Sequence, residues 1–288
     1  MSEPVWLEVA LNGGWGKKLQ PLIPVTPDEI IEQGVACAEA GAAIIHLHAY
    51  DPETERSCED AVIYADIIEG LKARTNAIVY PTLALRGSAE ERYAPLRWLG
   101  ERGLLEWAVV DPGTVNITHR AQIESGRNGF VYANPDDHIR LGLSLACEHG
   151  WHPSYAIYEP GFLRAGAWWA ERYKDLPAPI YRLMMPDHFT FGLPFKDWAL
   201  ETYTKLHAMS APGTPLMVAA FGNEPEPMIP VILDAGAHLR VGLEDAPAGS
   251  QRGNLELVTS ARKVIEDEGR ILASPDEVRR SLVALQKQ

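Results

Sequence analysis

The stretch "AIIHLHA", residues 43–49, is a short apolar run that ends in two histidines. Alternate residues of a strand point to the same side, so His46 and His48 are expected to converge on one spot. Similar β-rich runs recur along the chain and alternate with stretches that have the apolar spacing of helices. Eight runs are predicted to be the strands of one parallel sheet. They span residues 5–11, 43–49, 77–83, 106–111, 154–159, 180–185, 216–221 and 239–244.

Eight strands with helices between them fit a (β/α)8 TIM barrel, and we predict a single α/β barrel domain over residues 1–288. A ninth run, "FVYAN" at 130–134, is set aside as an excursion because the segment before it lacks a convincing crossover helix. The competing fold is a doubly wound open sheet. Its usual glycine-rich fingerprint is missing, since "NGGWGKK" at 12–18 does not read GxGxxG.

Two segments carry helix-start signals. "VTPDEI" at 25–30 and "ASPDEV" at 273–278 each place a hydroxyl residue before a proline and acidic residues. A hydroxyl caps the first turn, proline suits the first helical position, and acids complement the helix dipole. Helices are therefore expected to begin near Pro27 and Pro275.

Composition excludes several classes of protein. The 288 residues are 46% hydrophobic and 23% charged, with a formal net charge of −13, so a basic stripe for nucleic acid is not expected. No window approaches the roughly 18 apolar residues of a membrane span, which predicts neither export nor a membrane partner. Three separated cysteines without a CxxC pair fit the reducing cytoplasm.

Polar residues at the carboxyl ends of barrel strands are candidates for chemistry. They are Asn12, His46, His48, Thr82, Asp111, Glu159, Arg240, Glu244 and Asp245. A pair of same-side imidazoles favours a divalent metal, which needs only a third ligand from another strand. The HxH pattern alone fits a structural alternative about equally well. In that alternative, one histidine caps a helix and the other forms a hydrogen bond in the core.

"HLRVGLEDA", at 238–246, offers the third ligand. If this run is extended, Arg240 and Glu244 point to the same face and Asp245 begins the following loop. In a closed barrel the last strand lies beside the first, so Glu244 would lie near the two histidines. A surface cluster of salt bridges is the ordinary alternative for acids that flank an arginine.

Five segments resemble the β-keto acid cleavage enzyme family, whose type member cleaves 3-keto-5-aminohexanoate. "HLH" together with "RVGLED" is the most specific part of the resemblance, which runs from about residue 5 to about residue 280. The segments, in chain order, are "VTPDEI", "AGAAIIHLHAYDPET", "GTVN", "HLRVGLEDAP" and "SARKVIEDEGRILASPDEVR".

The resemblance implies a zinc-dependent barrel that converts a β-keto acid and acetyl-CoA into acetoacetate and a new acyl-CoA. It assigns one zinc ion to His46, His48 and Glu244, and the base to a pair formed by Arg240 and Asp245. A carboxylate beside a guanidinium ordinarily has a lowered pKa, so Asp245 is expected to be ionised but weakly basic.

The resemblance also implies two substrate contacts and an assembly. Thr82 matches a serine that contacts the substrate carboxylate, and Thr114 lies in the "GTVN" loop that resembles another contact. Both are also ordinary turn-capping residues. Family members are typically oligomeric, so a homo-oligomer, a tetramer by resemblance, is expected.

The loop "LNGGWGKK" at 11–18 departs from the type member, which carries a glutamate there for the substrate amine. Gly14 and Trp15 cannot pair with a buried ammonium, which would be costly to leave unpaired. We predict a β-keto acid with a neutral or anionic tail packed against Trp15. In the alternative, Trp15 points into a subunit interface and the tail is recognised elsewhere.

Two other functions remain open at this point. One is a metal-dependent hydrolase, or a retro-aldol or Claisen lyase that needs no CoA, on the same barrel. Hydrolases commonly need further histidine or aspartate ligands, and the runs at 180–185 and 216–221 contain no histidine. The other is a binding module, which would leave several charged groups buried without a task.

Overall fold

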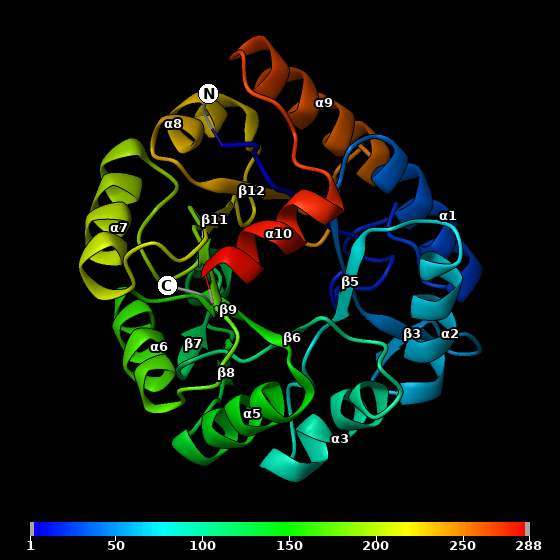
Figure 1. Cartoon of the computed structure of the whole chain (residues 1–288). Helices are drawn as coiled ribbons and strands as arrows, with labels where there is room; N and C mark the ends of the chain where they lie inside the picture. The colour runs from blue at the N-terminus through cyan, green and yellow to red at the C-terminus, as the bar shows by residue number, and fades with distance from the viewer. Residues whose placement is uncertain (1–2, 286–288) are drawn as a thin grey trace.

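The computed structural model describes residues 3–285, and its centre is a sheet of eight parallel strands (Figure 1). Neighbouring strands follow the order β5-β2-β1-β12-β11-β10-β9-β6. Each predicted run overlaps one of these strands, although β9 and β12 begin one or two residues before the predicted runs, and the arrangement confirms the TIM barrel prediction. The strands are β1 (Leu7–Ala10), β2 (Ile44–Leu47), β5 (Ile78–Pro81), β6 (Trp107–Val109), β9 (His152–Ile157), β10 (Ile180–Met184), β11 (Leu216–Ala219) and β12 (His238–Val241).

The sheet curves into a nearly closed barrel. β1 pairs with both β2 and β12, so the first and last strands of the barrel are neighbours. β5 and β6 stand at the two ends of the hydrogen-bonded order and contact each other across the remaining seam. The loops that follow β2 and β12 are therefore brought to the same part of the barrel mouth.

Helices form a ring around the strands, one after each (Figure 1). They begin as the sequence predicts: Thr26 and Glu29 form a reciprocal capping box in front of Pro27, and Ser274 pairs in the same way with Glu277. The helices of the ring are α1 (Pro27–Glu39), α2 (Ala61–Lys72), α3 (Ala89–Gly100), α5 (Asp136–His149), α6 (Pro160–Arg172), α7 (Asp197–Ser210), α8 (Ile229–Asp234), which follows the short helix η1 (Glu226–Met228), and α9 (Asn254–Asp267).

The last helix, α10 (Pro275–Leu285), crosses one end of the barrel (Figure 1). Its Arg279 donates to the Glu106 carboxylate at 2.6 Å and to the Asn76 carbonyl at 3.0 Å. Both partners precede strands, so α10 covers the amino ends of the strands. The opposite end, where the strands finish, is left for the site.

Two hairpins lie outside the barrel sheet. β7 (Val115–Ile117) pairs antiparallel with β8 (Phe130–Tyr132), and the short helix α4 (Arg120–Glu124) lies between them. This confirms that the run at 130–134 is an excursion. The second hairpin joins β3 (Ala49–Asp51) to β4 (Arg56–Cys58) directly after β2.

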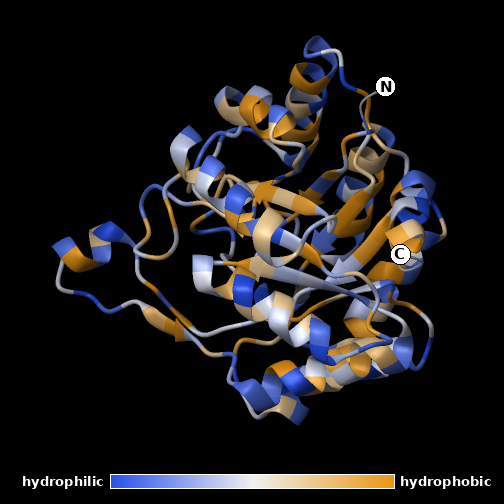
Figure 2. Ribbon diagram, turned by 60° about the vertical axis from the view of Figure 1, so that its left-hand side comes forward, coloured by the Kyte–Doolittle hydropathy of each residue, from blue (hydrophilic) through white to orange (hydrophobic). Residues whose placement is uncertain are grey.

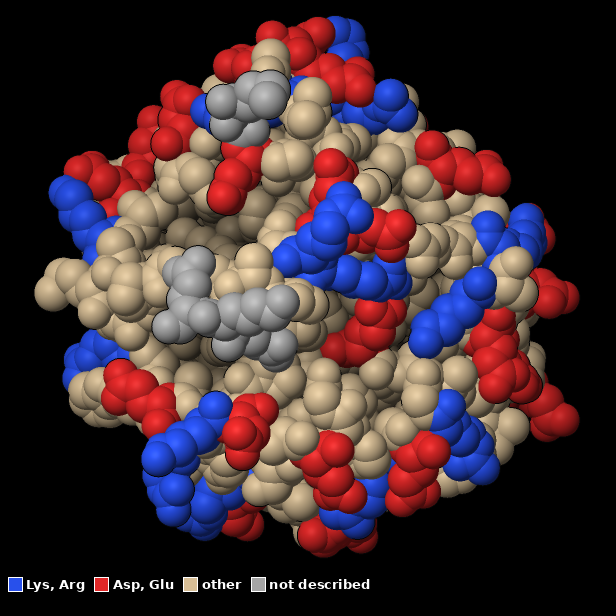
Figure 3. All heavy atoms as spheres, in the orientation of Figure 1, with Lys and Arg blue, Asp and Glu red and all other residues tan. Residues whose placement is uncertain are grey.

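Hydropathy follows this arrangement. The central strands are largely hydrophobic and the surrounding helices carry both hydrophobic and hydrophilic residues (Figure 2). Acidic and basic side chains are interspersed on the face shown in Figure 3. Among residues 3–285, no helix is both long and apolar enough to cross a membrane.

Candidate active site

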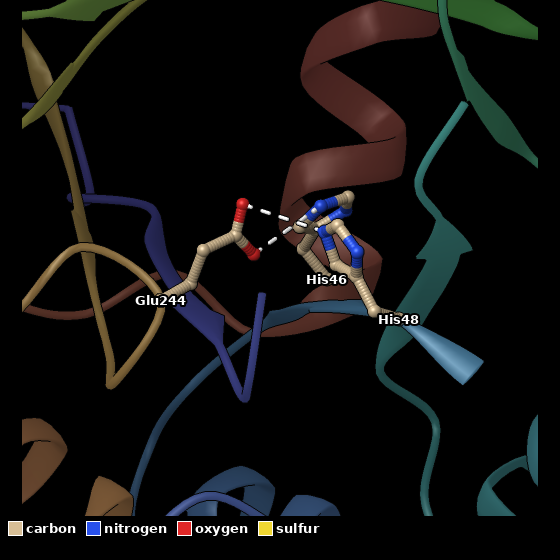
Figure 4. Close-up of side chains that lie close together, drawn as sticks. All are labelled: His46, His48 and Glu244. Atoms are coloured by element: carbon tan, nitrogen blue, oxygen red, sulfur yellow. Dashed lines mark ion pairs between the residues drawn. The ribbon is translucent and has the colours of Figure 1, made fainter. Parts of the chain in front are cut away.

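His46, His48 and Glu244 converge at the carboxyl end of the barrel (Figure 4). The Nε2 atom of His46 lies 3.5 Å from Oε2 of Glu244, and Nε2 of His48 lies 3.6 Å from Oε1. One donor atom from each of the three side chains lies within 4.8 Å of the other two. The three predicted ligands therefore form one cluster, although 198 positions separate His46 from Glu244 in the sequence.

The strand end that carries the histidines is held by Asn12, which follows β1. The Asn12 amide donates to the His48 carbonyl at 3.0 Å, and its carbonyl oxygen accepts from the His48 amide at 2.9 Å. Asn12 therefore fixes both backbone polar groups of His48. This contact explains physically why a polar residue ends the first strand.

Glu244 reaches the histidines through a turn and not through an extended strand. β12 ends at Val241, and Gly242 adopts a φ of 129°, a conformation that residues with a side chain rarely adopt. The prediction that 239–244 continues as a strand is therefore wrong at its end. The turn still brings Glu244 and Asp245 to the Arg240 guanidinium, with carboxylate oxygens 2.9 and 2.6 Å from its nitrogens.

Replacing Gly242 with alanine should lower the free energy of unfolding by about 2 kcal/mol, because a strained backbone would be combined with a steric clash. A Cβ at this position would lie 2.2 Å from the Ala10 carbonyl oxygen. Gly236→Ala is the matched control: Gly236 has a φ of 72° and open space around its would-be Cβ. Urea denaturation of both variants would test this, and equal stabilities would contradict the clash.

Arg240 is buried among carboxylates. Its Nε donates to Oδ2 of Asp245 at 2.6 Å and its Nη2 to Oδ1 at 3.1 Å, which is a two-point ion pair. Nη2 also lies 2.9 Å from Oε1 of Glu244, and Nη1 lies 3.3 Å from Oε1 of Glu8. Each of the three guanidinium nitrogens thus has a carboxylate partner.

Burial sets the basicity of Asp245. Removal from water raises the pKa of the Asp245 carboxyl, and this effect outweighs the lowering caused by Arg240. The expectation of a lowered pKa was therefore wrong in direction, because the sequence does not reveal how completely the pair is enclosed. A carboxylate with a raised pKa is a stronger base than an exposed salt-bridged one.

The donor set of the cluster suits a divalent metal. Nε2 of His48 and Oε2 of Glu244 are buried and have no hydrogen-bond partner within the described chain. Burial holds the pKa of His46 well below its usual range, so the imidazole is neutral and has a free lone pair at neutral pH. Two imidazoles and one carboxylate with open positions form a ligand set typical of catalytic zinc.

The cluster lies on the wall of a cavity of about 530 Å³. This volume lies within the range of small-molecule sites. Polar residues of the wall include His46, His48 and Glu244, and apolar residues of the loops also line it. The lining also contains Trp15, Glu59, Thr82, Leu85, Arg86, Asp111, Phe130, Arg182, Phe221 and Arg240.

Comparison with protein families gives the relationship of this chain to known proteins. The model of the beta-keto acid cleavage enzyme family matches residues 4–283. The chain belongs to this family. The resemblance inferred from the "HLH" and "RVGLED" motifs is thereby confirmed.

Characterised relatives are distant but of similar length. The chain is 26% identical to 3-keto-5-aminohexanoate cleavage enzyme of Fusobacterium nucleatum, over 92% of each chain. It is 24% identical to 3-dehydrocarnitine:acetyl-CoA trimethylamine transferase of Rhizobium meliloti, over 98% of this chain and 97% of the relative. It is 25% identical to 3-oxoadipate:acetyl-CoA acetyltransferase of Cupriavidus necator, over 97% and 94%. These relatives differ in the tail of their keto acid.

Solved structures support the barrel fold. The apo structure of ObcA superposes with a TM-score of 0.75 at 18% identity and covers 91% of this chain. The match covers 65% of the ObcA chain, so ObcA is considerably longer. At this level of identity the similarity concerns the fold alone.

The three predicted substrate contacts have different positions in this family member. Thr82 and Trp15 line the cavity, and the Trp15 indole donates to the Glu244 carbonyl at 2.7 Å. Thr114 is exposed and is not among the lining residues, since its hydroxyl accepts from the Asn134 amide at 2.8 Å within the β7–β8 excursion. The structure therefore does not bring Thr114 to the cavity, and its hydroxyl pairs with a residue 20 positions away instead of capping its own turn.

Sequence reasoning missed two charged residues beneath the site. Glu8 of β1 is fully buried and accepts from the Tyr80 hydroxyl at 2.7 Å. Arg182 of β10 is 3% exposed and donates to the same hydroxyl at 2.7 Å. The available signal was a charged residue inside an otherwise apolar strand, which is rarely accommodated without a partner.

Proposed function

We propose that this protein is a zinc-dependent enzyme that cleaves β-keto acids with acetyl-CoA, and that the whole chain forms one catalytic domain. One observation carries the proposal: His46, His48, Glu244 and Arg240 line one cavity, and Arg240 is joined to Asp245 by two hydrogen bonds. The relatives named for acetyl-CoA-dependent reactions of keto acids support the same activity.

In this proposal Asp245 takes a proton from C2 of the β-keto acid. Arg240 keeps the carboxylate of Asp245 oriented through two hydrogen bonds and compensates for its charge. C2 then attacks the thioester carbonyl of acetyl-CoA and expels CoA as a thiolate. The thiolate attacks the former ketone carbon, the C2–C3 bond of the substrate breaks, and protonated Asp245 returns its proton to C2. The products are acetoacetate and a new acyl-CoA, so all atoms are accounted for.

His46, His48 and Glu244 would hold the zinc ion. The ion would supply a Lewis acid that neutralises charge on the substrate oxygens. The protein's contribution is to keep the His46 imidazole neutral by burial and to hold His48 through Asn12. Second contacts of this kind orient ligands and tune affinity.

A second cavity supports a reaction of two substrates. It measures about 590 Å³ and adjoins the first, because Trp15, Phe221 and Glu244 line both. Asp245 lines the second cavity beside Glu244. In the proposal the keto acid lies where the two cavities share Glu244, beside Asp245, and acetyl-CoA approaches it through the second cavity.

The test is a panel of β-keto acids supplied with acetyl-CoA and scored for acetoacetate. Acetoacetate formed only in the presence of both acetyl-CoA and a β-keto acid is the expected result. Cleavage that proceeds equally without acetyl-CoA would contradict the proposal and favour the hydrolase or the CoA-independent lyase. Removal of metal by a chelator should abolish the activity, and added zinc should restore it.

The preferred substrate is proposed to carry a neutral or anionic tail packed against Trp15. An uncharged β-keto acid should therefore show a higher kcat/KM than its amino-substituted equivalent of the same chain length. Trp15→Glu should shift this ratio toward the amino compound, because it adds a partner for an ammonium group.

Glu59 provides the control for this prediction, since its carboxylate also lines the cavity. Glu59→Gln should leave the preference for the uncharged acid unchanged. A tenfold preference of the natural protein for the amino compound would overturn the prediction. Loss of that preference in Glu59→Gln would then identify Glu59 as the partner of the amine.

A further inference from the structure

Arg182 occupies an unusual position for a charged residue. It lies on β10 between the buried residues Tyr181 and Leu183 and is 3% exposed. It lines the same cavity as His46, His48 and Glu244. A guanidinium in such a place is desolvated by the barrel on one side and accessible to a ligand on the other. An anion in the cavity would therefore interact with it in a low-dielectric environment.

The hydrogen-bond partners of Arg182 are neutral, so no carboxylate compensates its positive charge at hydrogen-bond distance. Its Nη1 donates to two neutral groups, the Tyr80 hydroxyl at 2.7 Å and the Ser154 hydroxyl at 2.6 Å. The Nε–H is buried and has no acceptor within residues 3–285. The only carboxylate oxygen that the described structure places within 4.0 Å is Oε1 of Glu8, at 3.7 Å from Nη1.

Arg240 provides the contrast within the same cavity. Three carboxylates lie within 3.3 Å of its guanidinium nitrogens, those of Glu8, Glu244 and Asp245. An incoming anion would have to displace one of them. Of the two buried arginines on this wall, Arg182 is the one whose charge has no carboxylate at hydrogen-bond distance.

Arg182 is also linked to the candidate metal ligands through Tyr80. The Tyr80 ring packs against the His46 ring with centroids 4.7 Å apart, and the Tyr80 hydroxyl accepts from Arg182. In addition, Nη1 of Arg182 and Nη1 of Arg240 approach the same oxygen of Glu8. A small ligand bound at the cluster is therefore within short reach of the Arg182 guanidinium.

We propose that Arg182 binds the C1 carboxylate of the β-keto acid. The inference rests on the proposed function for the identity of the ligand and deepens it by assigning the group that recognises the acid. A guanidinium suits this role because its planar donors match a carboxylate. The tail would extend away from Arg182, toward Trp15 in the lining of the same cavity.

The experiment compares two ligands on the purified, zinc-supplemented protein. Acetoacetate carries the carboxylate, and acetylacetone is a neutral β-dicarbonyl in which a methyl ketone replaces it. Dissociation constants are measured by calorimetry for the natural protein and for Arg182→Met. Acetoacetate should bind roughly 10- to 100-fold more weakly to the variant, the range for loss of a hydrogen bond to a charged group. Acetylacetone should bind equally to both proteins.

Equal weakening of both ligands in a metal-replete variant would show a structural role for Arg182 and overturn the assignment. Unchanged acetoacetate binding would also overturn it. If weakening appears only with a keto acid that has a second, terminal carboxylate, Arg182 serves the tail and the C1 assignment is wrong.

Arg182→Lys keeps the inference testable if Arg182→Met fails to fold or loses zinc. Lysine retains the charge but not the planar pair of donors, so a smaller loss, at least roughly threefold and again confined to acetoacetate, is expected. Equal binding of both ligands by Arg182→Lys and the natural protein would contradict the proposal. Because these measurements require no turnover, a protein that binds acetoacetate through Arg182 without cleaving keto acids would refute the proposed function alone.

Discussion

His48→Ala should purify without its divalent metal. The substitution removes one of three ligands and leaves His46 and Glu244, which are too few to hold zinc tightly. We expect the affinity for zinc to fall at least about 100-fold, since removal of even an outer-shell partner typically costs 10- to 100-fold. Elemental analysis after dialysis should give one metal per chain for the natural protein and close to none for the variant.

His188→Ala is the matched control, because this imidazole is exposed and lies outside the cluster. It should retain one metal per chain. A thermal shift provides a second measurement: a chelator should lower the Tm of the natural protein, since metal binding stabilises the folded state, and should leave the Tm of His48→Ala unchanged. Full metal occupancy of His48→Ala would refute the ligand assignment.

Asp245→Asn should retain zinc but lose turnover by a factor of roughly 10² or more, the scale for removal of a general base. The amide has nearly the same shape, so the turn after Gly242 is expected to persist. Arg240 would remain oriented by Glu8 and Glu244, whose oxygens lie 3.3 and 2.9 Å away. The defect should therefore appear in kcat and not in metal content.

Exchange of the C2 hydrogen with deuterated water isolates this step. The natural protein should accelerate exchange of a β-keto acid in the absence of acetyl-CoA, and Asp245→Asn should not. An active, metal-replete Asp245→Asn enzyme would exclude Asp245 as the base. Loss of metal in this variant would instead place Asp245 among the ligands.

Local patterns were sufficient to predict much of this protein. Alternation along a strand depends only on neighbouring residues, so "HLH" predicted two imidazoles on one side before any tertiary contact was known. Helix starts are equally local, and the capping box of Thr26 and Glu29 follows from four consecutive residues. Eight strands at even intervals then left the barrel as the simplest way to bury them.

Extended-strand reasoning failed where a single glycine changes the direction of the chain. The motif "RVGLED" predicted the right residues, but the bend depends on Gly242 and on how closely the Ala10 backbone approaches it. Sequence reasoning likewise could not place Thr114, because its surroundings depend on how the β7–β8 hairpin folds back. Both of these contacts involve segments that are distant in sequence, so local patterns cannot predict them.

The sequence by itself determined the strands, the helix starts and the residues able to bind a metal, since these depend on short-range periodicity and side-chain chemistry. Only the tertiary structure decided which charges meet beneath the site. Glu8 and Arg240 are direct partners in the register of β1 and β12, although 232 positions separate them. Barrel closure sets that register, and it leaves Arg240 surrounded by carboxylates while the carboxylate near Arg182, that of Glu8, stays 3.7 Å away.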